Sequence, residues 1–438
     1  MLVHGSDPCV ELEEYLGMSR SRTFVVFLVV IGIVTASGGA ARAGGRGRRG
    51  QRDRTLRIGQ LAPESGSLMD LLPSLTAPVT MAVDEINAAG GVLGRPVTYT
   101  LADDGGDAIA TKYGLDSLLV HAKVDAIMGP ASSESTLGIL QDIRHAHVLT
   151  CSGSNTATEL SAAGSGGYYF RTVPSDRFQG PALARLVLGE GRKRIGILAR
   201  DDSYGRGLRS AVRKELTKGG AKVVADVAYD SHATELAGDV GEVVAEKPDA
   251  VIVLGLERDG SEIVRSMIAT GLGPQQLPIY GADGMRTSGF ASAVDFNNPA
   301  TVAGIKGTSP SVAPAGTHNA FPEAFAATGV DPSFSPYYYD CTILTALAAV
   351  TARSNEAVKM KDAFASNIRG KQKCSTFAEC KKLLEEGKTI AYEGASAGFA
   401  HMNKFGRSEP NAGVYDVWAF DNAGHSNAEP PDKQIRIG

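Results

Sequence analysis

Short apolar runs alternate with longer segments of helical periodicity along the chain from residue 56 onward. The run VDAIM at 124–128 and the run AVIVL at 250–254 are typical of buried strands, whereas residues 71–89 carry apolar residues at helical spacing and end at Gly90-Gly91. Strands that alternate with helices in this way predict parallel sheets in an α/β architecture.

The alternation falls into two successive series. In the first, we predict strands at residues 56–61, 97–101, 124–128 and 147–151, with helices at 71–89, 108–121 and 133–143. In the second, we predict strands at 194–198, 222–228, 250–254 and 277–280, with helices at 205–216, 236–245 and 262–269. The C-terminal quarter differs, with helices at 336–350, 361–369 and 377–386 before strands and turns that include 414–420. The two series predict two similar lobes, each a doubly wound parallel sheet. Such sheets bind ligands outside the carboxyl ends of their strands.

The N-terminal segment has the pattern of an export signal. Arg20 and Arg22 precede an apolar run at 24–34, and small residues then end in Ala41-Arg42-Ala43. This order is typical of a secretory signal peptide, and the run is shorter than the roughly 20 apolar residues of a membrane helix. We expect residues 1–43 to be an N-terminal extension and signal peptide cleaved near Ala43; an uncleaved anchor is the alternative.

Two further features flank this signal. Met18 lies two residues before Arg20, which indicates that translation starts there and that residues 1–17 are an artefact of an early start codon. Residues 44–54 are rich in Gly and Arg and lack an apolar pattern, so we expect a flexible tether; a basic anion-binding arm is the alternative.

Composition and charge narrow the function classes. The chain has 438 residues, of which 43% are hydrophobic and 21% charged, which is ordinary for a globular protein. Lys and Arg number 44 against 48 Asp and Glu, a net charge of -4, and this near-neutral balance argues against nucleic acid as the main partner. Five cysteines are too few for a disulfide scaffold.

Two polar loops follow successive strands of the first series. GPASSEST at 129–136 opens a helix, where hydroxyls and free amides suit a carboxylate; plain N-capping by Ser132 or Ser133 is the alternative. Cys151-Ser152-Gly153-Ser154-Asn155 follows the next strand and offers further donors at the same edge; a polar turn is the alternative there.

The second series contributes two more candidates. Asp283 lies in GADG at 281–284, where a carboxylate at the end of a strand suits an ammonium; from these residues alone, an Asp in a tight turn is the favoured alternative. Tyr204 follows the strand at 194–198 and either caps a ligand or covers a loop.

These and other blocks resemble the solute-binding proteins of branched-chain amino acid ABC transporters, the leucine/isoleucine/valine-binding type. The resemblance covers roughly residues 56–420, and DEINAAGGVLGRPV and YEGAS are its most distinctive parts. The blocks that carry it are LRIGQLAPESG at Leu56, AVDEINAAGGVLGRPV at Ala82, ADDGGD at Ala102, GPASSEST at Gly129, RIGILARDDSYGRGL at Arg194, IYGADG at Ile279 and YEGASAG at Tyr392.

The resemblance implies a type I periplasmic-binding fold with three hinge crossings. Lobe 1 would comprise residues 55–173 and 310–395, and lobe 2 residues 174–309 and 396–430. The function implied is an exported protein that captures a small amino acid between the lobes and delivers it to an ABC transporter permease. It would be periplasmic, bind no nucleic acid and be a monomer.

Site residues are carried over by position. Ser133 falls where a hydroxyl binds the ligand carboxylate, and Ser152, Gly153 and Ser154 fall in the second carboxylate-binding loop. From the second lobe, Tyr204 matches a tyrosine and Asp283 falls where an acidic residue takes the ligand ammonium.

The sequence also departs from the family pattern. Leu71 falls where the family often has an aromatic residue, and Gly255-Leu256-Glu257-Arg258 lacks tyrosines found in some members, so that Glu257 or Arg258 could contact a polar ligand group. Two alternatives therefore stay open: a ligand-sensing module for a signalling receptor, and a binder of an amide, a urea-like solute or an aromatic acid.

Cysteines and enzyme motifs complete the sequence predictions. Cys374 and Cys380 bracket a short polar segment, and the same pair recurs in relatives, so we expect a disulfide there, while Cys341 on an apolar helix is expected to be a core residue. GASAG at 394–398 matches the nucleophile elbow G-x-S-x-G, but the strand-turn-helix context is missing. With no P-loop, HExxH or dinucleotide motif, we predict no enzyme, no cofactor and no metal.

Overall fold

The computed structural model describes residues 54–396 and 409–438. The predicted signal peptide at 1–43 and all of the predicted tether except Arg54 lie outside these residues. Within them, no helix combines the length and the apolar character that are needed to cross a membrane.

The first sheet has five strands in the order β2-β1-β3-β4-β5, and every neighbouring pair is parallel. The order changes direction at β1, which makes this a doubly wound sheet. Its strands are β1 (Arg57–Ala62), β2 (Thr98–Asp103), β3 (Ala126–Met128), β4 (Leu149–Ser152) and β5 (Tyr169–Arg171).

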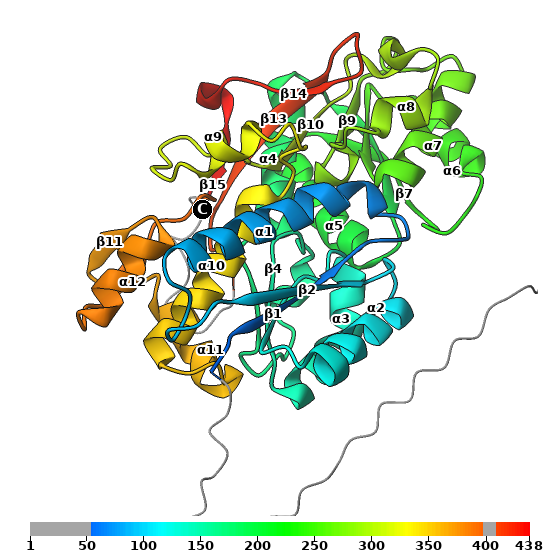
Figure 1. Ribbon diagram of the computed structural model, residues 1–438. Helices are drawn as coiled ribbons and strands as arrows, with labels where there is room; N and C mark the ends of the chain where they lie inside the picture. The colour runs from blue at the N-terminus through cyan, green and yellow to red at the C-terminus, as the bar shows by residue number, and fades with distance from the viewer. Residues whose placement is uncertain (1–53, 397–408) are drawn as a thin grey trace, which may run out of the picture. The chain divides into compact units, whose positions relative to one another are not determined.

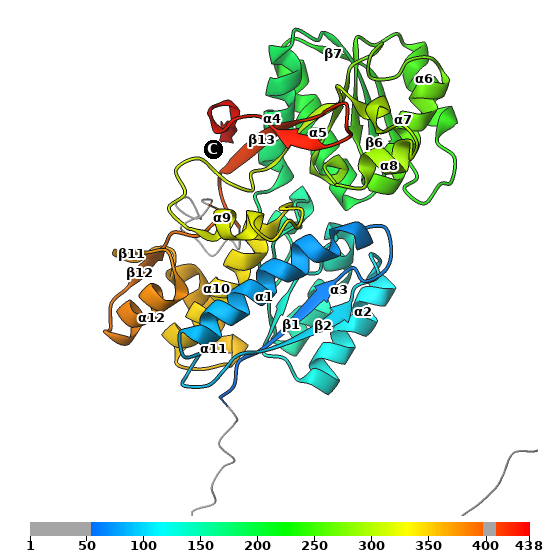
Figure 2. The same ribbon diagram turned by 45° about the horizontal axis from the view of Figure 1, so that its top comes forward.

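Helices cover both faces of this sheet. Figure 2 shows α1 (Leu72–Ala88) beside α10 (Ser335–Ala352), whereas α2 (Ala108–Asp116) and α3 (Ser133–Ala146) lie on the other side of β1 and β2. Helix α10 is buried around its whole circumference from Ser335 to Ala349, which explains its apolar sequence. Residues 335–352, although remote in sequence, therefore complete the core of the first lobe.

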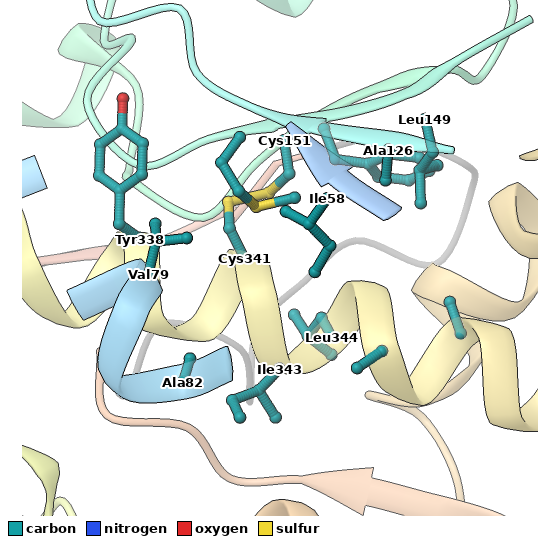
Figure 3. Packing of buried hydrophobic residues seen from close by; sticks show 14 of the residues in the cluster. Ile58, Val79, Ala82, Ala126, Leu149, Cys151, Tyr338, Cys341, Ile343 and Leu344 are labelled. Carbon is teal, nitrogen blue, oxygen red and sulfur yellow. A yellow bond between two sulfur atoms is a disulfide. The ribbon is translucent and has the colours of Figure 1, made fainter. Parts of the chain in front are cut away.

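A disulfide joins this helix to the sheet. Cys151 at β4 bonds Cys341 of α10 with a Cα–Cα distance of 5.6 Å, and Figure 3 shows the bond among Ile58, Tyr338 and Leu344. The prediction that Cys341 is simply a core residue was incomplete: its side chain is buried, but it is covalently paired with a cysteine 190 residues earlier in the chain.

The second sheet is mixed rather than wholly parallel. Its order is β14-β13-β10-β9-β8-β6-β7, with β15 also paired to β13. Strands β10, β9, β8, β6 and β7 follow one another in parallel, but β13 runs antiparallel to β10, β14 and β15. The strands are β6 (Arg194–Arg200), β7 (Lys222–Tyr229), β8 (Ala250–Leu254), β9 (Ile279–Gly281), β10 (Lys306–Pro310), β13 (Gly413–Phe420), β14 (Ser426–Ala428) and β15 (Ile435–Ile437).

Two groups of helices cover the second sheet. Helices α4 (Asp176–Gly189) and α5 (Ser203–Lys218) pack together on one face (Figure 1). Helices α6 (Ala237–Ala245), α7 (Glu257–Ala269) and α8 (Phe290–Val294) cover the other. Helix α4 was not predicted, because Gly180-Pro181 interrupts its pattern; a Cβ on Gly180 would lie 2.4 Å from that of Ala211, so this glycine allows α4 and α5 to approach.

A small subdomain closes the C-terminal part of the first lobe. It contains α11 (Ala357–Ser366), α12 (Phe377–Glu385) and the parallel pair β11 (Gln372–Cys374) and β12 (Ile390–Tyr392). Cys374 and Cys380 are disulfide-bonded in it, with a Cα–Cα distance of 5.3 Å. Helix α9 (Phe321–Ala326) lies in the segment that leads to α10.

The YEGAS motif anchors the chain before its last crossing. The Tyr392 hydroxyl and the Ala395 amide donate to Asp340 Oδ1 at 2.8 and 2.9 Å, and the Ser396 amide donates to Oδ2 at 2.8 Å. A Cβ on Gly394 would lie 2.4 Å from the same carboxylate. The motif therefore holds a strand to α10; residues 397 and 398 of the formal elbow lie outside the described part of the chain.

Charged side chains join the end of β5 and the start of α4 to Glu409. Arg171 at the end of β5 donates to Glu409 from Nε at 2.9 Å, and Arg177 in α4 pairs with the other Glu409 oxygen at 3.2 Å. Arg171 also donates to the Asn155 and Ala157 carbonyls, at 2.9 Å each. This buried arginine links the end of β5, the segment that begins at Glu409 and the loop after β4.

Candidate functional site

A cavity of about 210 Å³ lies where loops after the strands of both sheets meet. This is the edge that a doubly wound sheet uses for ligands, and the volume suits a small solute. Residues of the first lobe, together with Phe334 just before α10, form one side of the lining. They are Ser67, Leu68, Leu71, Gly106, Asp107, Ala108, Ala131, Ser132, Ser133, Glu134, Ser154, Thr156 and Phe334. Those from the second lobe are Arg200, Asp202, Tyr204, Ser231, His232, Leu256, Asp283 and Gly284.

The structure brings five of the predicted residues together at this cavity. Ser133, Ser154 and Leu71 line it from the first lobe, and Tyr204 and Asp283 line it from the second. Residues from two separate predicted series thus meet at one site.

Ser152 and Gly153 do not line the cavity. The Ser152 hydroxyl donates to the Pro130 carbonyl at 2.9 Å and accepts from the Ser154 amide, so it joins the two loops behind the wall. A Cβ on Gly153 would lie 2.7 Å from the Tyr338 amide nitrogen, so this glycine lets α10 pack against the loop. Their predicted ligand contacts are replaced by structural roles.

Glu257 also lies away from the cavity lining. It is the first residue of α7, where the Thr287 hydroxyl donates to its carboxylate. Burial and the neighbouring charge of Asp70 raise the pKa of Glu257. Leu256, the preceding residue, faces the cavity instead, so this loop contributes apolar surface where the sequence had suggested a polar contact.

The first wall is built on the N-terminus of α3. Ser132 caps the helix: its hydroxyl accepts from the Ser135 amide at 3.3 Å and its carbonyl from the Thr136 amide at 3.0 Å. Among the described residues, the amides of Ser133 and Glu134 have no such acceptor. Both predicted roles of this loop are therefore compatible, because Ser132 caps the helix while Ser133 and the free amides face the cavity.

Asn155 holds the second loop of this wall against the first. Its amide nitrogen donates to the Pro130 and Ala131 carbonyls at 3.0 and 2.8 Å, and its oxygen accepts from the Thr136 hydroxyl at 2.7 Å. The Ser154 hydroxyl donates to the Ala131 carbonyl at 2.9 Å. Because both loops are braced in this way, Ser133 and Ser154 are held in place before any ligand arrives.

The second wall centres on Asp283. The Gln179 amide and the Tyr204 hydroxyl both donate to its Oδ1, at 2.6 and 3.1 Å. Gly284 permits this approach, since a Cβ there would lie 2.6 Å from the Gly255 carbonyl and 3.4 Å from the Tyr204 hydroxyl. Tyr204 itself sits in the first turn of α5, which Asp202 caps by accepting from the Gly205 amide at 2.8 Å.

Burial dominates the electrostatics of this wall. It raises the pKa of Asp283 to about 6, although the hydrogen bonds from Gln179 and Tyr204 oppose the shift. Asp176, fully buried nearby, has its pKa raised by burial and by the charge of Asp283. The wall therefore holds carboxylates that gain from an arriving positive charge.

A hydrogen bond joins α3 of the first wall to α5 of the second. The Ser203 amide at the start of α5 donates to Glu134 Oε2 of α3 at 2.9 Å. A carboxylate at a helix N-terminus is a favourable arrangement, so this contact stabilises the approach of the two walls.

Gln179 and Arg200 are site residues that the sequence interpretation missed. Gln179 lies in the unpredicted helix α4, so nothing pointed to it. Arg200 ends β6, two residues beyond the predicted strand, and a search for charged residues at every strand end could have found it.

The described residues hold no group of three or more His, Cys, Asp or Glu side chains arranged to bind a metal ion. In the cavity, the Ser133 hydroxyl and the amides at the start of α3 lie opposite the carboxylate of Asp283, which is suited to a small dipolar molecule.

A family model described as periplasmic binding protein matches residues 55–377. The chain belongs to the periplasmic binding protein family. The match runs from the start of the first sheet to Phe377, the first residue of α12. It includes most strands of the second sheet and every loop that lines the cavity.

Individual proteins extend the comparison. The chain is 27% identical over 350 residues to the chemotactic signal transduction system substrate-binding protein BasB of Halobacterium salinarum, covering 77% of this chain and 81% of that protein. It is 28% identical to the Leu/Ile/Val-binding protein BraC3 of Rhizobium johnstonii over 53% of this chain and 62% of that one.

A solved structure shows the same fold. It is the branched-chain amino acid transporter substrate-binding protein LivJ of Streptococcus pneumoniae in complex with isoleucine, with a TM-score of 0.68 and 22% identity, covering 87% of this chain and 100% of that chain.

Proposed function

We propose that this periplasmic binding protein captures a small amino acid between its two lobes and delivers it to the permease of an ABC transporter. The observation that carries the proposal is the opposition of the two cavity walls. The Ser133 hydroxyl and the amides at the start of α3, with Ser154 beside them, lie opposite a wall that contains the buried carboxylate of Asp283.

Each end of a zwitterion finds a matching wall. The ligand carboxylate accepts hydrogen bonds from Ser133 and from the free amides of α3, with Ser154 beside it, while the ammonium donates to Asp283. Tyr204, already hydrogen-bonded to Asp283, covers the ligand. A buried charge is tolerated only when it is paired and hydrogen-bonded, so both ends need these partners.

The proposed mechanism uses two lobes that move relative to each other. We assign residues 55–173 and 310–395 to lobe 1 and residues 174–309 and 396–430 to lobe 2, and we propose that bending at the crossings opens and closes the cavity. The closed form would dock on the permease as a monomer, without chemistry on the ligand. Residues 1–43 would direct export and be removed near Ala43, which N-terminal sequencing of the mature protein would test.

Calorimetry with chemically matched ligands tests the proposed recognition. The ligands are the twenty free amino acids, the N-acetyl and carboxamide forms of the tightest binder, and benzoate and urea. We expect N-acetylation and amidation each to abolish measurable binding, because each removes one charge that a wall recognises. Benzoate or urea binding more tightly than every amino acid would contradict the proposal and favour the aromatic-acid or urea-like alternative.

A sensing role is the second candidate, and the similarity to BasB, a chemotactic signal transduction system substrate-binding protein, favours it. Binding would be the same, but the closed form would dock on a receptor. Pull-down of the loaded protein with detergent-solubilised membranes, followed by identification of the captured partner as a permease or a receptor, distinguishes the two.

A further inference from the structure

Arg200 is the only arginine or lysine among the described residues that line the cavity. It is the last residue of β6 and is 8% exposed, so its guanidinium is almost wholly enclosed. In the proposed function, Ser133 and Asp283 serve the carboxylate and the ammonium of the amino acid, so Arg200 is left for a different group of the ligand. Its presence in the wall therefore calls for another ligand contact.

Two carboxylates fix the orientation of this guanidinium. Nε donates to Asp202 Oδ2 at 2.7 Å, and Nη1 donates to Asp259 Oδ1. Asp259 is itself held by the Tyr229 hydroxyl at 2.5 Å and by the Leu256 amide at 3.2 Å. The planar group thus has little freedom to turn.

The third guanidinium nitrogen of Arg200, Nη2, has no hydrogen-bond partner in the described part of the protein. Nη2 of Arg200 donates to no described residue, and it is not among the fully enclosed polar atoms that lack a partner. Arg200 lines the cavity, so an accessible and unpaired guanidinium nitrogen of this residue lies within reach of the ligand space. A nearly buried donor with an unused N–H at a ligand site is well placed to recognise an oxygen of the ligand.

The charges around Arg200 indicate whether the ligand oxygen that it contacts is charged or neutral. Asp202 caps α5 and Asp259 lies in the first turn of α7, so the helix N-termini and Arg200 together offset their two negative charges. Asp107 and Glu134 add two further carboxylates to the lining. A second carboxylate on the ligand would face these acids, whereas a neutral oxygen would gain the hydrogen bond without that repulsion.

The spacing suits an amino-acid side chain. Asp283 follows β9 and Arg200 ends β6, and only β8 lies between these strands. Two strand spacings amount to roughly 10 Å, which a small amino acid can span with a hydrogen bond of about 3 Å at each end.

We propose that Arg200 Nη2 donates a hydrogen bond to an uncharged side-chain oxygen of the ligand, so that the site selects amino acids with hydroxyl or amide side chains over apolar ones of the same shape. This inference rests on the proposed function, because it places the amino-acid head between Ser133 and Asp283.

Isosteric ligand pairs test the selectivity directly in the wild-type protein. Threonine and valine differ by a hydroxyl in place of a methyl group, and glutamine and glutamate differ in charge. By calorimetry we expect threonine to bind roughly 10- to 100-fold more tightly than valine, and glutamine more tightly than glutamate. Valine binding at least as tightly as threonine, or glutamate more tightly than glutamine, would overturn the inference.

A conservative variant links that selectivity to Arg200. Arg200→Lys keeps the positive charge but loses the planar fork, so we expect the threonine-to-valine ratio to fall to within about threefold. Arg206→Lys, an arginine whose side chain is 47% exposed, is the matched control and should keep the wild-type ratio. Thermal unfolding verifies that both variants are folded, and an unchanged ratio in folded Arg200→Lys would refute the role of Arg200.

The outcomes separate this inference from the proposed function. If no amino acid binds, the proposed function fails and the inference fails with it. If amino acids bind and N-acetylation abolishes binding, but apolar ligands are preferred, the proposed function stands and only the role of Arg200 is overturned.

Discussion

The two walls of the cavity are built on different principles. On the first wall, neutral hydroxyls and amides are held in place by Asn155, by the Ser152 hydroxyl and by a helix joined to the sheet through Cys151–Cys341. On the second wall, buried charges hold one another, as in the pairing of Arg200 with Asp202 and Asp259. All the cysteines among the described residues belong to segments of the first lobe.

This difference teaches how the site divides its task. Neutral donors at a helix N-terminus cost little to keep ready when the cavity contains only water. A buried carboxylate such as Asp283 is costly until a cation arrives, so under the proposed function most of the electrostatic gain from ligand binding would come from the second wall. The first wall would mainly provide shape.

The largest expected effect concerns the covalent brace of the first lobe. Replacing Cys151 and Cys341 together by alanine removes a link that spans 190 residues and should lower the free energy of unfolding by about 5 kcal/mol. Replacing Cys374 and Cys380, only 6 residues apart, should cost roughly 2 kcal/mol. Urea unfolding of the oxidised proteins measures both, and equal losses would contradict the importance of the long-range link.

The next effect is on the second wall. Asp283→Ala removes the partner of the ligand ammonium and should weaken amino-acid binding by about 2–5 kcal/mol. Asp201→Ala is the matched control, because Asp201 lies in the same lobe but its side chain is 57% exposed and outside the cavity. Calorimetry that found equal affinities for the two variants would remove Asp283 from the site.

The pH dependence of amino-acid binding should show that the second wall dominates, because protons compete with the ligand ammonium for Asp283. Burial raises the pKa of Asp283 to about 6, and only its ionised form attracts the ammonium. Affinity should therefore be constant above about pH 6 and fall roughly tenfold per pH unit below it. Asp283→Asn should abolish this dependence, whereas variants of the hydroxyl wall should retain it.

Raising the pH should strengthen ligand binding but lower the contribution of Asp283 to the free energy of unfolding. Because the folded pKa of Asp283 lies above its unfolded value of 3.8, its contribution to the free energy of unfolding is fully present below that value and is lost as pH rises through about 6. Denaturant titrations of the ligand-free wild type and of Asp283→Asn at several pH values measure this contribution. An identical pH profile in both proteins would contradict it.

The smallest expected effect is on the first wall. Ser133→Ala removes one hydroxyl, but the free amides at the start of α3 remain, so affinity should fall by only about 1 kcal/mol. Ser132→Ala is the informative comparison, because it removes the cap of α3 and should lower stability by about 1 kcal/mol. A loss of affinity in Ser133→Ala as large as that in Asp283→Ala would refute the proposed division between the walls.

Local patterns were sufficient to predict much of the fold and part of the site. Alternating apolar runs and helical periodicity predicted two α/β lobes, and the rule that ligands bind at strand ends led to Ser133, Tyr204 and Asp283. These features are visible locally because burial and helix capping are set by residues a few positions apart.

Other features were decided only when distant segments packed together. The antiparallel end of the second sheet, the pairing of Cys151 with Cys341 and the contact of Gln179 with Asp283 join residues 104 or more positions apart. Ser152, Gly153 and Glu257 had suitable chemistry and adjacent positions, yet packing turned them away from the cavity.

The chain order of residues therefore determined which strand ends could carry a ligand, whereas the tertiary structure decided which side chains at those ends face it. The physical reason is that periodicity reports whether a residue is buried. Which neighbour it meets depends on how whole helices and sheets fill the space between them.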